Sequence, residues 1–314
     1  MELGPIKDLD SWAAEAREKI DGRPVVASIS GGKDSTAMAL LFREAGIPFK
    51  AVHCDTGWEH EDTERYVREY LPTVIGEIEV IQGRYGGMED LIRKFGMFPN
   101  RTKRYCTREL KVLPMKDLLL SLDEEPVNAI GIRAAESARR AKMKEWERSD
   151  GFDCWTWRPM IRWTEQDVIS IHRDFGVMPN PLYLRGASRV GCYPCIFSRK
   201  KEIAAIAEAS PDRISRIRAL ENEVYEIASK RESRSEGWDI TKIRPTWFGL
   251  ARTGKKDGRT WQIDEVVEWS KTSRGGRQFE LFTANESDAG CMRWGLCETV
   301  ASEGDMGWSN GGEE

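Results

Sequence analysis

The sequence lacks any long hydrophobic run. No stretch of about eighteen apolar residues occurs, so no membrane-spanning helix is expected. Residues 1–5 also lack the basic and then apolar pattern of a secretory leader. From these two absences we expect a cytoplasmic protein without a membrane partner. The 40% of hydrophobic and 32% of charged residues are typical of a globular enzyme.

Histidine is scarce, and an excess of basic charge is absent. The chain has three histidines and a formal net charge of −4, so it carries no global signature of nucleic-acid binding. A local basic patch is compatible with that net charge. Seven cysteines are present, and without a leader they do not predict a disulfide scaffold. The cysteines therefore indicate metal or redox chemistry.

The sequence does contain a glycine loop between a strand-like and a helix-like stretch. The run 24–27 is apolar and β-prone, residues 30–35 read Ser-Gly-Gly-Lys-Asp-Ser, and an apolar helical face begins at Met38. Paired glycines allow a sharp turn close to a ligand, and the next helix directs free N–H groups and its positive dipole end into that turn. This order predicts a phosphate-binding loop rather than a plain turn with an exposed lysine, although it is not the Walker pattern. The residues expected to contact phosphate are Ser30, Gly31, Gly32, Lys33, Asp34 and Ser35.

Further candidate contacts follow two other strand-like runs. Ligands of parallel α/β sheets lie at the carboxyl ends of strands, so Asp55 and Thr56, after the run 48–54, are expected beside the phosphate loop. An ordinary Asp-Thr-Gly turn is the alternative. Arg133 and Arg140 follow the run 127–132 and have planar guanidinium groups suited to phosphate or sulfate. A charged helix start is the alternative there.

The remaining periodicity predicts the fold class. A helix is expected from a cap at Asp10-Ser11 to Ile20, a third strand at 78–81, and helices at 64–71, at 88–95 and after a Thr164 cap. This alternation predicts an α/β, Rossmann-like fold with a mainly parallel sheet and helices on both faces. The stretch 100–111 holds five basic residues and one cysteine, and it is open to two interpretations: a solvated helix start capped by Thr107, or an anion-binding wall with a cysteine ligand.

The composition divides the chain into three parts. Residues 1–200 are expected to form the nucleotide-binding domain. Residues 201–300 are expected to be a helical or irregular region that contributes one metal-binding cysteine. The Gly/Ser/Glu-rich end, 301–314, is expected to be disordered.

The strongest metal signal is the Cys-x-x-Cys pair of Cys192 and Cys195. A thioredoxin-like redox pair is disfavoured because no matching βαβ context surrounds it, which leaves a zinc site or an iron–sulfur cluster. Because the chain has only three histidines, four cysteines are the easier set of ligands to assemble, and we favour a 4Fe–4S cluster. The expected ligands are Cys106, Cys192, Cys195 and Cys291, with Cys297 as the alternative fourth ligand. Cys154, among tryptophans, is expected in the core.

These motifs, in this order, resemble a known family. The loop at 30–35 resembles the PP-loop of the ATP-pyrophosphatase superfamily. The segments 53–63, 100–114 and 131–140, together with Pro-Leu-Tyr and Arg-Val-Gly-Cys-x-x-Cys at 181–195, resemble phosphoadenylyl-sulfate (PAPS) reductases. The resemblance covers residues 24–198. It implies an adenine nucleotide, ATP or PAPS, held by the loop with Asp55 near the adenosine.

The resemblance also carries two departures. Iron–sulfur members have a cysteine pair where this chain has Tyr105-Cys106. The Lys-x-x-Pro turn that follows in the family is matched here by residues 111–114. Family reductases have a nucleophilic cysteine in a late Glu-Cys-Gly-(Ile/Leu)-His sequence. This chain has no such sequence, and its candidate, Cys297, is followed by Glu298.

Three functions therefore stay open. One is reduction of a sulfonucleotide, in which Cys297 attacks sulfur and sulfite leaves. The second is cleavage of ATP between its α- and β-phosphates, with Mg²⁺ on the phosphates, followed by sulfur transfer, as in proteins of DNA phosphorothioation and tRNA thiolation. The third is a nucleotide-sensing module without turnover. Lys33 and Asp34 are the candidate catalytic residues of the loop.

Several partners accompany these functions. An electron- or sulfur-donor protein, a nucleic-acid substrate and a homodimer are the candidates. A basic, glycine-containing loop at 251–259 is the segment that the sequence offers for nucleic-acid contact. An ordinary surface hairpin is the alternative for that loop.

Overall fold

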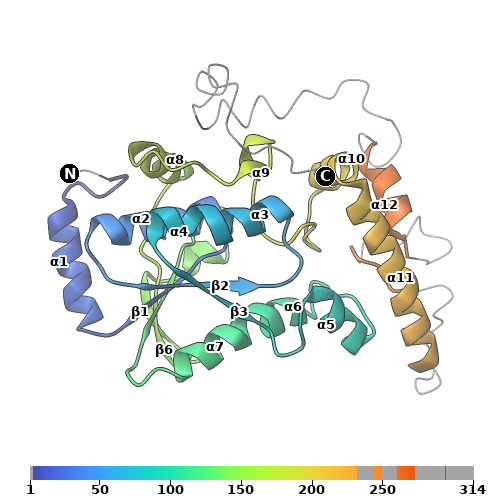
Figure 1. Ribbon diagram of the computed structural model, residues 1–314, viewed down its shortest axis with the longest axis horizontal. Helices are drawn as coiled ribbons and strands as arrows, with labels where there is room; N and C mark the ends of the chain where they lie inside the picture. Colours follow the sequence, from blue (N-terminus) through green and yellow to red (C-terminus); the bar gives the residue numbers. More distant parts are fainter. Residues whose placement is uncertain (1–2, 232–243, 249–259, 273–293, 295–314) are drawn as a thin grey trace, which may run out of the picture.

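The computed structural model describes residues 3–231, 244–248, 260–272 and 294 (Figure 1). This part of the chain contains a six-stranded sheet in the order β3-β2-β1-β4-β6-β5. The strands are β1 (Val25–Ser28), β2 (Lys50–Asp55), β3 (Ile78–Gln82), β4 (Val127–Ile130), β5 (Trp146–Ser149) and β6 (Cys154–Trp157). Every pairing is parallel except that of β5 with β6. The predicted mainly parallel α/β fold is confirmed.

The helical elements surround this sheet. The α-helices before residue 200 are α1 (Leu9–Ile20), α2 (Lys33–Glu44), α3 (Glu61–Arg65), α4 (Leu71–Ile75), α5 (Met88–Phe95), α6 (Tyr105–Thr107), α7 (Leu113–Leu120), α8 (Glu165–Asp174) and α9 (Pro181–Leu184). Those after it are α10 (Lys200–Ala209), α11 (Pro211–Arg231) and α12 (Ile263–Ser270). Short π-helical turns are η1 (Tyr66–Tyr70) and η2 (Arg108–Val112), and 3-10 turns are η3 (Ala134–Glu136) and η4 (Arg140–Lys142). None of the described helices is both long enough and apolar enough to span a bilayer.

The sheet is buried on both faces, which explains its apolar strands. Successive side chains of a strand point to opposite faces. Val25 and Ala27 of β1 therefore join the core formed with α1, α2, α4 and α8, whereas Val26 packs with Met115 and Leu119 of α7. Figure 1 shows α2 and α4 on one side of the sheet and α7 on the other. Strands covered on both faces read as continuous apolar runs rather than alternating ones.

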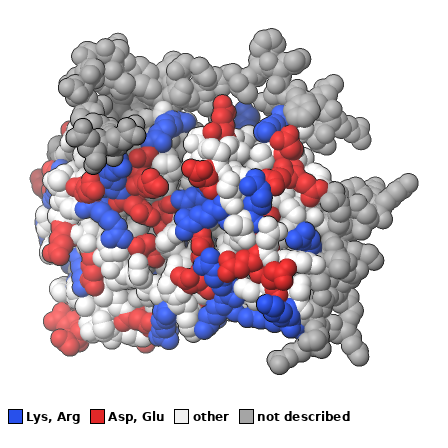
Figure 2. Space-filling model, turned by 45° about the vertical axis from the view of Figure 1, so that its right-hand side comes forward, with Lys and Arg blue, Asp and Glu red and all other residues white. Residues whose placement is uncertain are grey.

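A second large core joins the late helices to the early chain. Ile217 and Val224 of α11 and Val266 of α12 share one hydrophobic cluster with Leu91 of α5 and Leu110 of η2. On the surface, α5 and α11 are also joined by charge pairs, and Figure 2 shows acidic and basic side chains interspersed over the described part of this side of the molecule. The domain division at residue 200 stays a prediction. The helices after it nevertheless share a core with residues before it.

Three local predictions are wrong. The first helix begins at Leu9 and is capped by Asp8, whose carboxylate accepts a hydrogen bond from the Asp10 N–H, because Leu9 already belongs to the buried face. The alternative of a helix start capped by Thr107 is also wrong, because its side chain makes no capping hydrogen bond, and 111–114 is no turn, since α6, η2 and α7 follow one another without a break. Pro114 is the second residue of α7 and directly follows the π-helical turn η2. Strand β5 was not predicted because Trp-Glu-Arg-Ser at an edge has no apolar alternation.

Glu221 of α11 connects the late segments to one another. Its buried carboxylate accepts hydrogen bonds from the N–H groups of Trp247 (2.9 Å) and Ile263 (2.8 Å) and from the Thr246 hydroxyl (3.0 Å). Burial raises the pKa of Glu221 above its usual 4.5, against the effect of these donors. A single carboxylate thus satisfies the first amide of α12 and fixes the 244–248 segment on α11.

We expect Glu221→Ala to lower the free energy of unfolding by about 2–4 kcal/mol, because it leaves buried donors unpaired. Chemical denaturation measures the change. The matched control is Glu223→Ala on the same helix, which breaks an exposed pair with Arg93 and should cost less than about 1 kcal/mol. Because the pKa of Glu221 is raised, the wild type should lose stability relative to Glu221→Gln as the pH rises above 4.5. Equal effects of the two alanine variants would contradict the role assigned to Glu221.

Candidate functional site

The loop between β1 and α2 lies at the carboxyl edge of the sheet and closes on itself through its serines. Ser35 Oγ accepts a hydrogen bond from the Ser30 N–H (3.1 Å) and donates one to the Gly32 carbonyl (3.0 Å). The Ser30 hydroxyl lies 3.1 Å from Ser35 Oγ. Both side chains thus set the loop's shape.

Gly31 is required by backbone geometry and by close packing. Its φ of +71° is in the left-handed region, and a Cβ there would lie 2.7 Å from Val67 Cγ2. The Asn180 side chain donates to the Gly31 carbonyl (3.2 Å) and to Thr63 Oγ1 (3.1 Å). The loop therefore turns sharply against η1 and α3 and is tied there by Asn180.

The turn leaves backbone donors available. Helix α2 begins at Lys33, so the N–H groups of its first residues have no intrahelical acceptor. In the described part of the chain, the amides of Gly31, Asp34 and Ser35 have no hydrogen-bond acceptor. These donors, with the positive end of the α2 dipole, form a cradle for an anion.

Side chains from the second half of the domain hold the first residue of α2. The Tyr183 hydroxyl accepts a hydrogen bond from the Lys33 N–H (3.1 Å), and His172 Nε2 lies 3.0 Å from the Lys33 carbonyl oxygen. Burial lowers the pKa of His172, so the ring is neutral and Nε2 donates to the carbonyl. Trp294 packs against both rings, with centroid distances of 5.2 Å to His172 and 5.8 Å to Tyr183. His172 is thus a structural histidine, and sequence reasoning did not connect it or Tyr183 to the loop because their partners are backbone atoms.

Four charged groups meet at the start of α2. Lys33 Nζ lies 3.2 Å from a carboxylate oxygen of Glu165 and 3.9 Å from one of Asp34, and 4.8 Å from the Tyr183 ring centre. Arg133 forms an ion pair with the other oxygen of Asp34. Lys33 and Arg133 are each only 6% exposed. The alternative of an exposed lysine in a plain turn is therefore wrong.

Gly131, which follows β4, allows the strand to approach α2 closely. A Cβ on this residue would lie 2.7 Å from the Asp34 carbonyl oxygen and 2.7 Å from Ser35 Cα. Both are backbone atoms of the first turn of α2, which cannot move aside as a side chain could. This contact places Arg133, two residues further on, beside Asp34. The sequence alone does not indicate that this glycine lies against the backbone of α2.

The other predicted nucleotide contacts are spread along the same edge. Asp55 ends β2, next to β1, and accepts hydrogen bonds from the Gly57 N–H (2.8 Å), Gln82 (3.1 Å) and Arg68 (2.7 Å). Burial acts to raise the pKa of Asp55, but these donors outweigh it and the pKa is lowered. The carboxylate is therefore ionised and oriented near neutral pH.

Thr56 and Arg140 do not join the group of charges around Lys33. The Thr56 hydroxyl donates to Glu59 (2.6 Å) and lies 3.9 Å from Cys192 Sγ, so it contacts the cysteine loop. Arg140 lies on η4 and forms an ion pair with Glu136. Arg133 is therefore the arginine that the fold brings to the loop.

Three of the predicted metal ligands are neighbours. Cys106, Cys192 and Cys195 are partly buried, and Cys195 interacts electrostatically with each of the other two. Burial raises the pKa of the Cys106 and Cys192 thiols. Lys111 lies among them, and the nearby thiol of Cys192 is the main cause of its raised pKa.

This set of donors fits a thiolate-bound metal centre chemically, since the Lys111 ammonium would offset thiolate charge. Within the described ranges, however, no three His, Cys, Asp or Glu side chains are positioned to hold a metal ion. Cys291 and Cys297 lie outside the described residues, as does the loop at 251–259. Cys154 is 1% exposed in the core, as predicted, at the amino end of β6.

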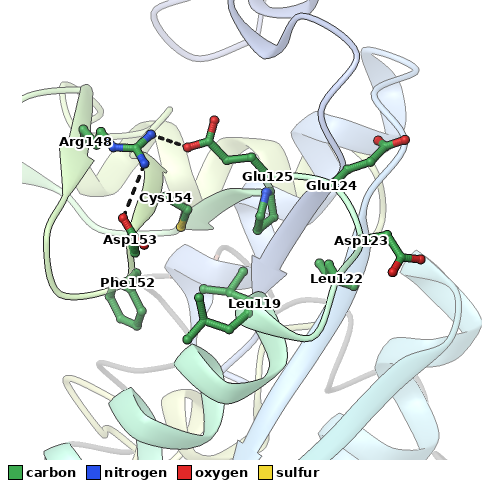
Figure 3. Close-up of a pocket in the computed structure, with 11 residues that line it drawn as sticks. Leu119, Leu122, Asp123, Glu124, Glu125, Arg148, Phe152, Asp153 and Cys154 are labelled. Atoms are coloured by element: carbon green, nitrogen blue, oxygen red, sulfur yellow. Dashed lines mark hydrogen bonds and ion pairs between the residues drawn. The ribbon is translucent and has the colours of Figure 1, made fainter.

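A pocket of about 280 Å³ lies at the opposite edge of the sheet, at the amino ends of β4 and β6 (Figure 3). Its floor is apolar and includes Leu119 and Phe152. Figure 3 shows Arg148 paired with Glu125 and Asp153 at its rim. Asp123 and Glu124 add further negative charge there, so phosphate groups are disfavoured and the phosphate loop is the better candidate site.

The strand, glycine loop and helix, with cations buried at the helix start, define an α/β protein of the nucleotide-binding PP-loop class. The family model described as the phosphoadenosine phosphosulfate reductase domain matches residues 24–198. The chain belongs to this family, which confirms the resemblance found in the sequence.

The chain is also similar to individual proteins. A 37.8 kDa protein of Escherichia phage 186 is 29% identical over 87% of this chain and 96% of its own length. The adenosine 5'-phosphosulfate reductase of Burkholderia cepacia is 24% identical over 60% of this chain and 76% of its own. Among solved structures, the phosphoadenylyl-sulfate reductase of Candida auris in a phosphate complex has a TM-score of 0.48 at 14% identity, covering 58% of this chain and 88% of that one.

The close approach at Gly131 generates a prediction. Gly131→Ala should lower the free energy of unfolding by about 1–3 kcal/mol, because its methyl group overlaps the backbone of α2. The matched control is Gly151→Ala in the β5–β6 connection, where the nearest atom to the new Cβ is Ser149 Oγ at 3.6 Å. Thermal and denaturant unfolding compare the two. If Gly131→Ala is as stable as Gly151→Ala, the strand does not constrain the helix.

Proposed function

We propose that the protein is an adenine-nucleotide-dependent enzyme of sulfur metabolism that binds ATP or a sulfonucleotide such as PAPS at residues 30–35. One observation carries the proposal: in a member of this family, the free amides of the loop face the same helix start as two buried cations, Lys33 and Arg133. Phosphate groups are the ligands that such a cradle favours.

The roles of the loop residues follow from their contacts. The amides of Gly31, Asp34 and Ser35 would bind phosphate oxygens, while Ser30 and Gly32 keep the loop closed. Lys33 Nζ would move from Glu165 to a phosphate, a short displacement for a flexible side chain. Asp55 is the nearest oriented carboxylate on β2 for the adenosine part, as the family resemblance implies.

A second candidate function is favoured by the missing reductase motif. The sequence has no Glu-Cys-Gly-(Ile/Leu)-His, so a late cysteine with a neighbouring histidine is not available for sulfonucleotide reduction. In ATP-dependent sulfur transfer, an acceptor oxygen attacks the α-phosphorus and pyrophosphate leaves with the electron pair of the broken P–O bond. The terminal sulfur of a persulfide donor then attacks the activated acceptor and AMP leaves, and a second thiol of the donor cleaves the resulting S–S bond, which frees the thiolated acceptor and leaves a disulfide on the donor. Lys33 and Arg133 would stabilise the charge that develops on the phosphates, and Asp34, which they now pair, would be available to a phosphate-bound Mg²⁺.

We also propose that Cys106, Cys192 and Cys195 hold an iron–sulfur cluster, with Cys291 or Cys297 as the fourth ligand. The cluster would supply electron transfer or sulfur chemistry next to the nucleotide. Lys111 would offset the negative charge of the thiolates, and Thr56 would connect the cluster loop to the end of β2. A zinc site is the alternative for the same thiols.

The experiment that tests the function is an anaerobic comparison of ATP and PAPS. We expect pyrophosphate release from ATP if the second candidate is correct, and sulfite release from PAPS if the protein is a reductase. Lys33→Ala should lower the affinity for the active nucleotide about 10–100-fold, through loss of a charge-assisted contact. Isothermal titration measures it.

The matched control is Lys50→Ala, at the amino end of β2, where the lysine pairs with Glu79 on the surface. This variant should bind nucleotide as the wild type does. Tight binding with neither product would favour the sensing module. Unchanged affinity of Lys33→Ala for both nucleotides would refute the phosphate-loop assignment.

The cluster generates a separate prediction. Protein purified without oxygen should be brown and contain iron and acid-labile sulfide, and serine substitution of Cys106, Cys192 or Cys195 should remove most of the iron. Cys154→Ser is the control. Because the Cys154 thiol lies at the opposite edge of the sheet, this variant should retain its iron. Colourless protein with stoichiometric zinc would contradict the cluster and show that these cysteines bind zinc instead.

A further inference from the structure

The two segments that carry Cys106 and the Cys192–Cys195 pair are strongly basic. Residues 100–111 and 185–202 together contain ten Lys or Arg residues and two acidic ones, in a chain whose net charge is −4. Positive charge is thus concentrated on the segments that present the thiols. Compensation of buried thiolates explains Lys111, which lies among the cysteines, but not the residues that face solvent.

The structure brings these two segments side by side. The Arg104 guanidinium lies 5.1 Å from the centre of the Phe197 ring, and Cys106 and Cys192 pack against the same hydrophobic cluster. The basic residues of both segments therefore belong to one surface around the cysteines, rather than to two separate loops.

Much of this charge is exposed and lacks compensation. Arg101, Lys103, Arg104 and Arg199 are exposed and have no ion-pair partner among the described residues. By contrast, Arg93, Arg216 and Arg218, on α5 and α11, each pair with a carboxylate. Unpaired cations at the surface are the groups that attract a polyanion.

We infer that this surface, defined as Arg101, Lys103, Arg104 and Arg199, binds a nucleic-acid strand. Six of the ten basic residues in the two segments are arginines, whose planar forks bind phosphate bidentately. The partly buried Phe197 ring lies beside Arg104 on the same surface, and an aromatic ring of this kind is a group on which a base can stack. An acidic protein would use the charge but not the ring, so nucleic acid is the occupant that the surface favours.

This inference rests on the proposed function for one point, namely that the bound strand is the acceptor of the chemistry. The charge of the surface does not depend on it. Binding of oligonucleotide and binding of ATP are therefore measured separately on the same preparation.

The test uses fluorescence anisotropy of a labelled 20-nucleotide single strand and of the corresponding duplex, as DNA and as RNA, from 50 to 300 mM salt. We expect wild-type affinity to fall with salt. The triple variant Arg101→Gln, Lys103→Gln, Arg199→Gln should bind at least about 10-fold more weakly at 50 mM salt. For the single strand, the slope of log affinity against log salt concentration should be smaller in magnitude by about 2, because three phosphate contacts are lost.

The matched control removes the same charge elsewhere. Lys7→Gln, Lys19→Gln and Arg173→Gln are exposed and have no ion pair among the described residues, so the combined variant should bind as the wild type does. ATP affinity should be unchanged in both triple variants. If ATP binds but no oligonucleotide does, the inference fails while the proposed function stands.

Equal weakening in both triple variants would show a non-specific charge effect and would also overturn the inference. Preference for a poly-glutamate peptide over every oligonucleotide would assign the surface to an acidic protein instead. Oligonucleotide binding that depends on the surface, without binding of either ATP or PAPS, would support the inference and refute the proposed function.

Discussion

The backbone turn at Gly31 and Gly32 is the constraint on which the rest of the site depends. It directs unpaired amides toward one point, and an unpaired amide is tolerated only where water or a ligand can reach it. Side chains from 150 residues further along fix the turn: Asn180 holds the Gly31 carbonyl and Tyr183 the first amide of α2. The cradle is therefore a property of the whole domain rather than of six consecutive residues.

The same second half of the domain also carries the cysteine loop. Asn180 and Tyr183 lie just before Cys192, and the Tyr193 N–H donates to the Trp58 carbonyl (2.8 Å), two residues after Thr56. One continuous stretch, 180–195, therefore supports the phosphate loop at its start and presents thiols at its end. The loop and the thiols are thus held at a fixed separation by shared backbone contacts, which the proposed combination of nucleotide and sulfur chemistry requires.

The parts of this site that depend on local sequence pattern can be predicted from the sequence. The strand–loop–helix at 24–38 and the helix at 88–95 follow from runs of apolar residues, and the Thr164 capping box follows from two polar residues three apart. The other parts of the site depend on partners that are distant in the sequence. The position of Glu165 predicts only a helix start, yet its carboxylate is the countercharge of Lys33. Gly131 has no local signal, because its role is the space that it leaves for α2.

The charges at the loop suggest how nucleotide binding would be coupled to catalysis. Lys33 and Arg133 are both paired with carboxylates, so an incoming phosphate must compete with Asp34 and Glu165. A single weak anion would gain little from that exchange. A polyphosphate brings several charges and also satisfies the free amides, so it can displace both ion pairs together. Asp34 would then lose its two cations at the moment when a phosphate-bound metal ion needs a carboxylate, which makes the ligand itself the agent that completes the site.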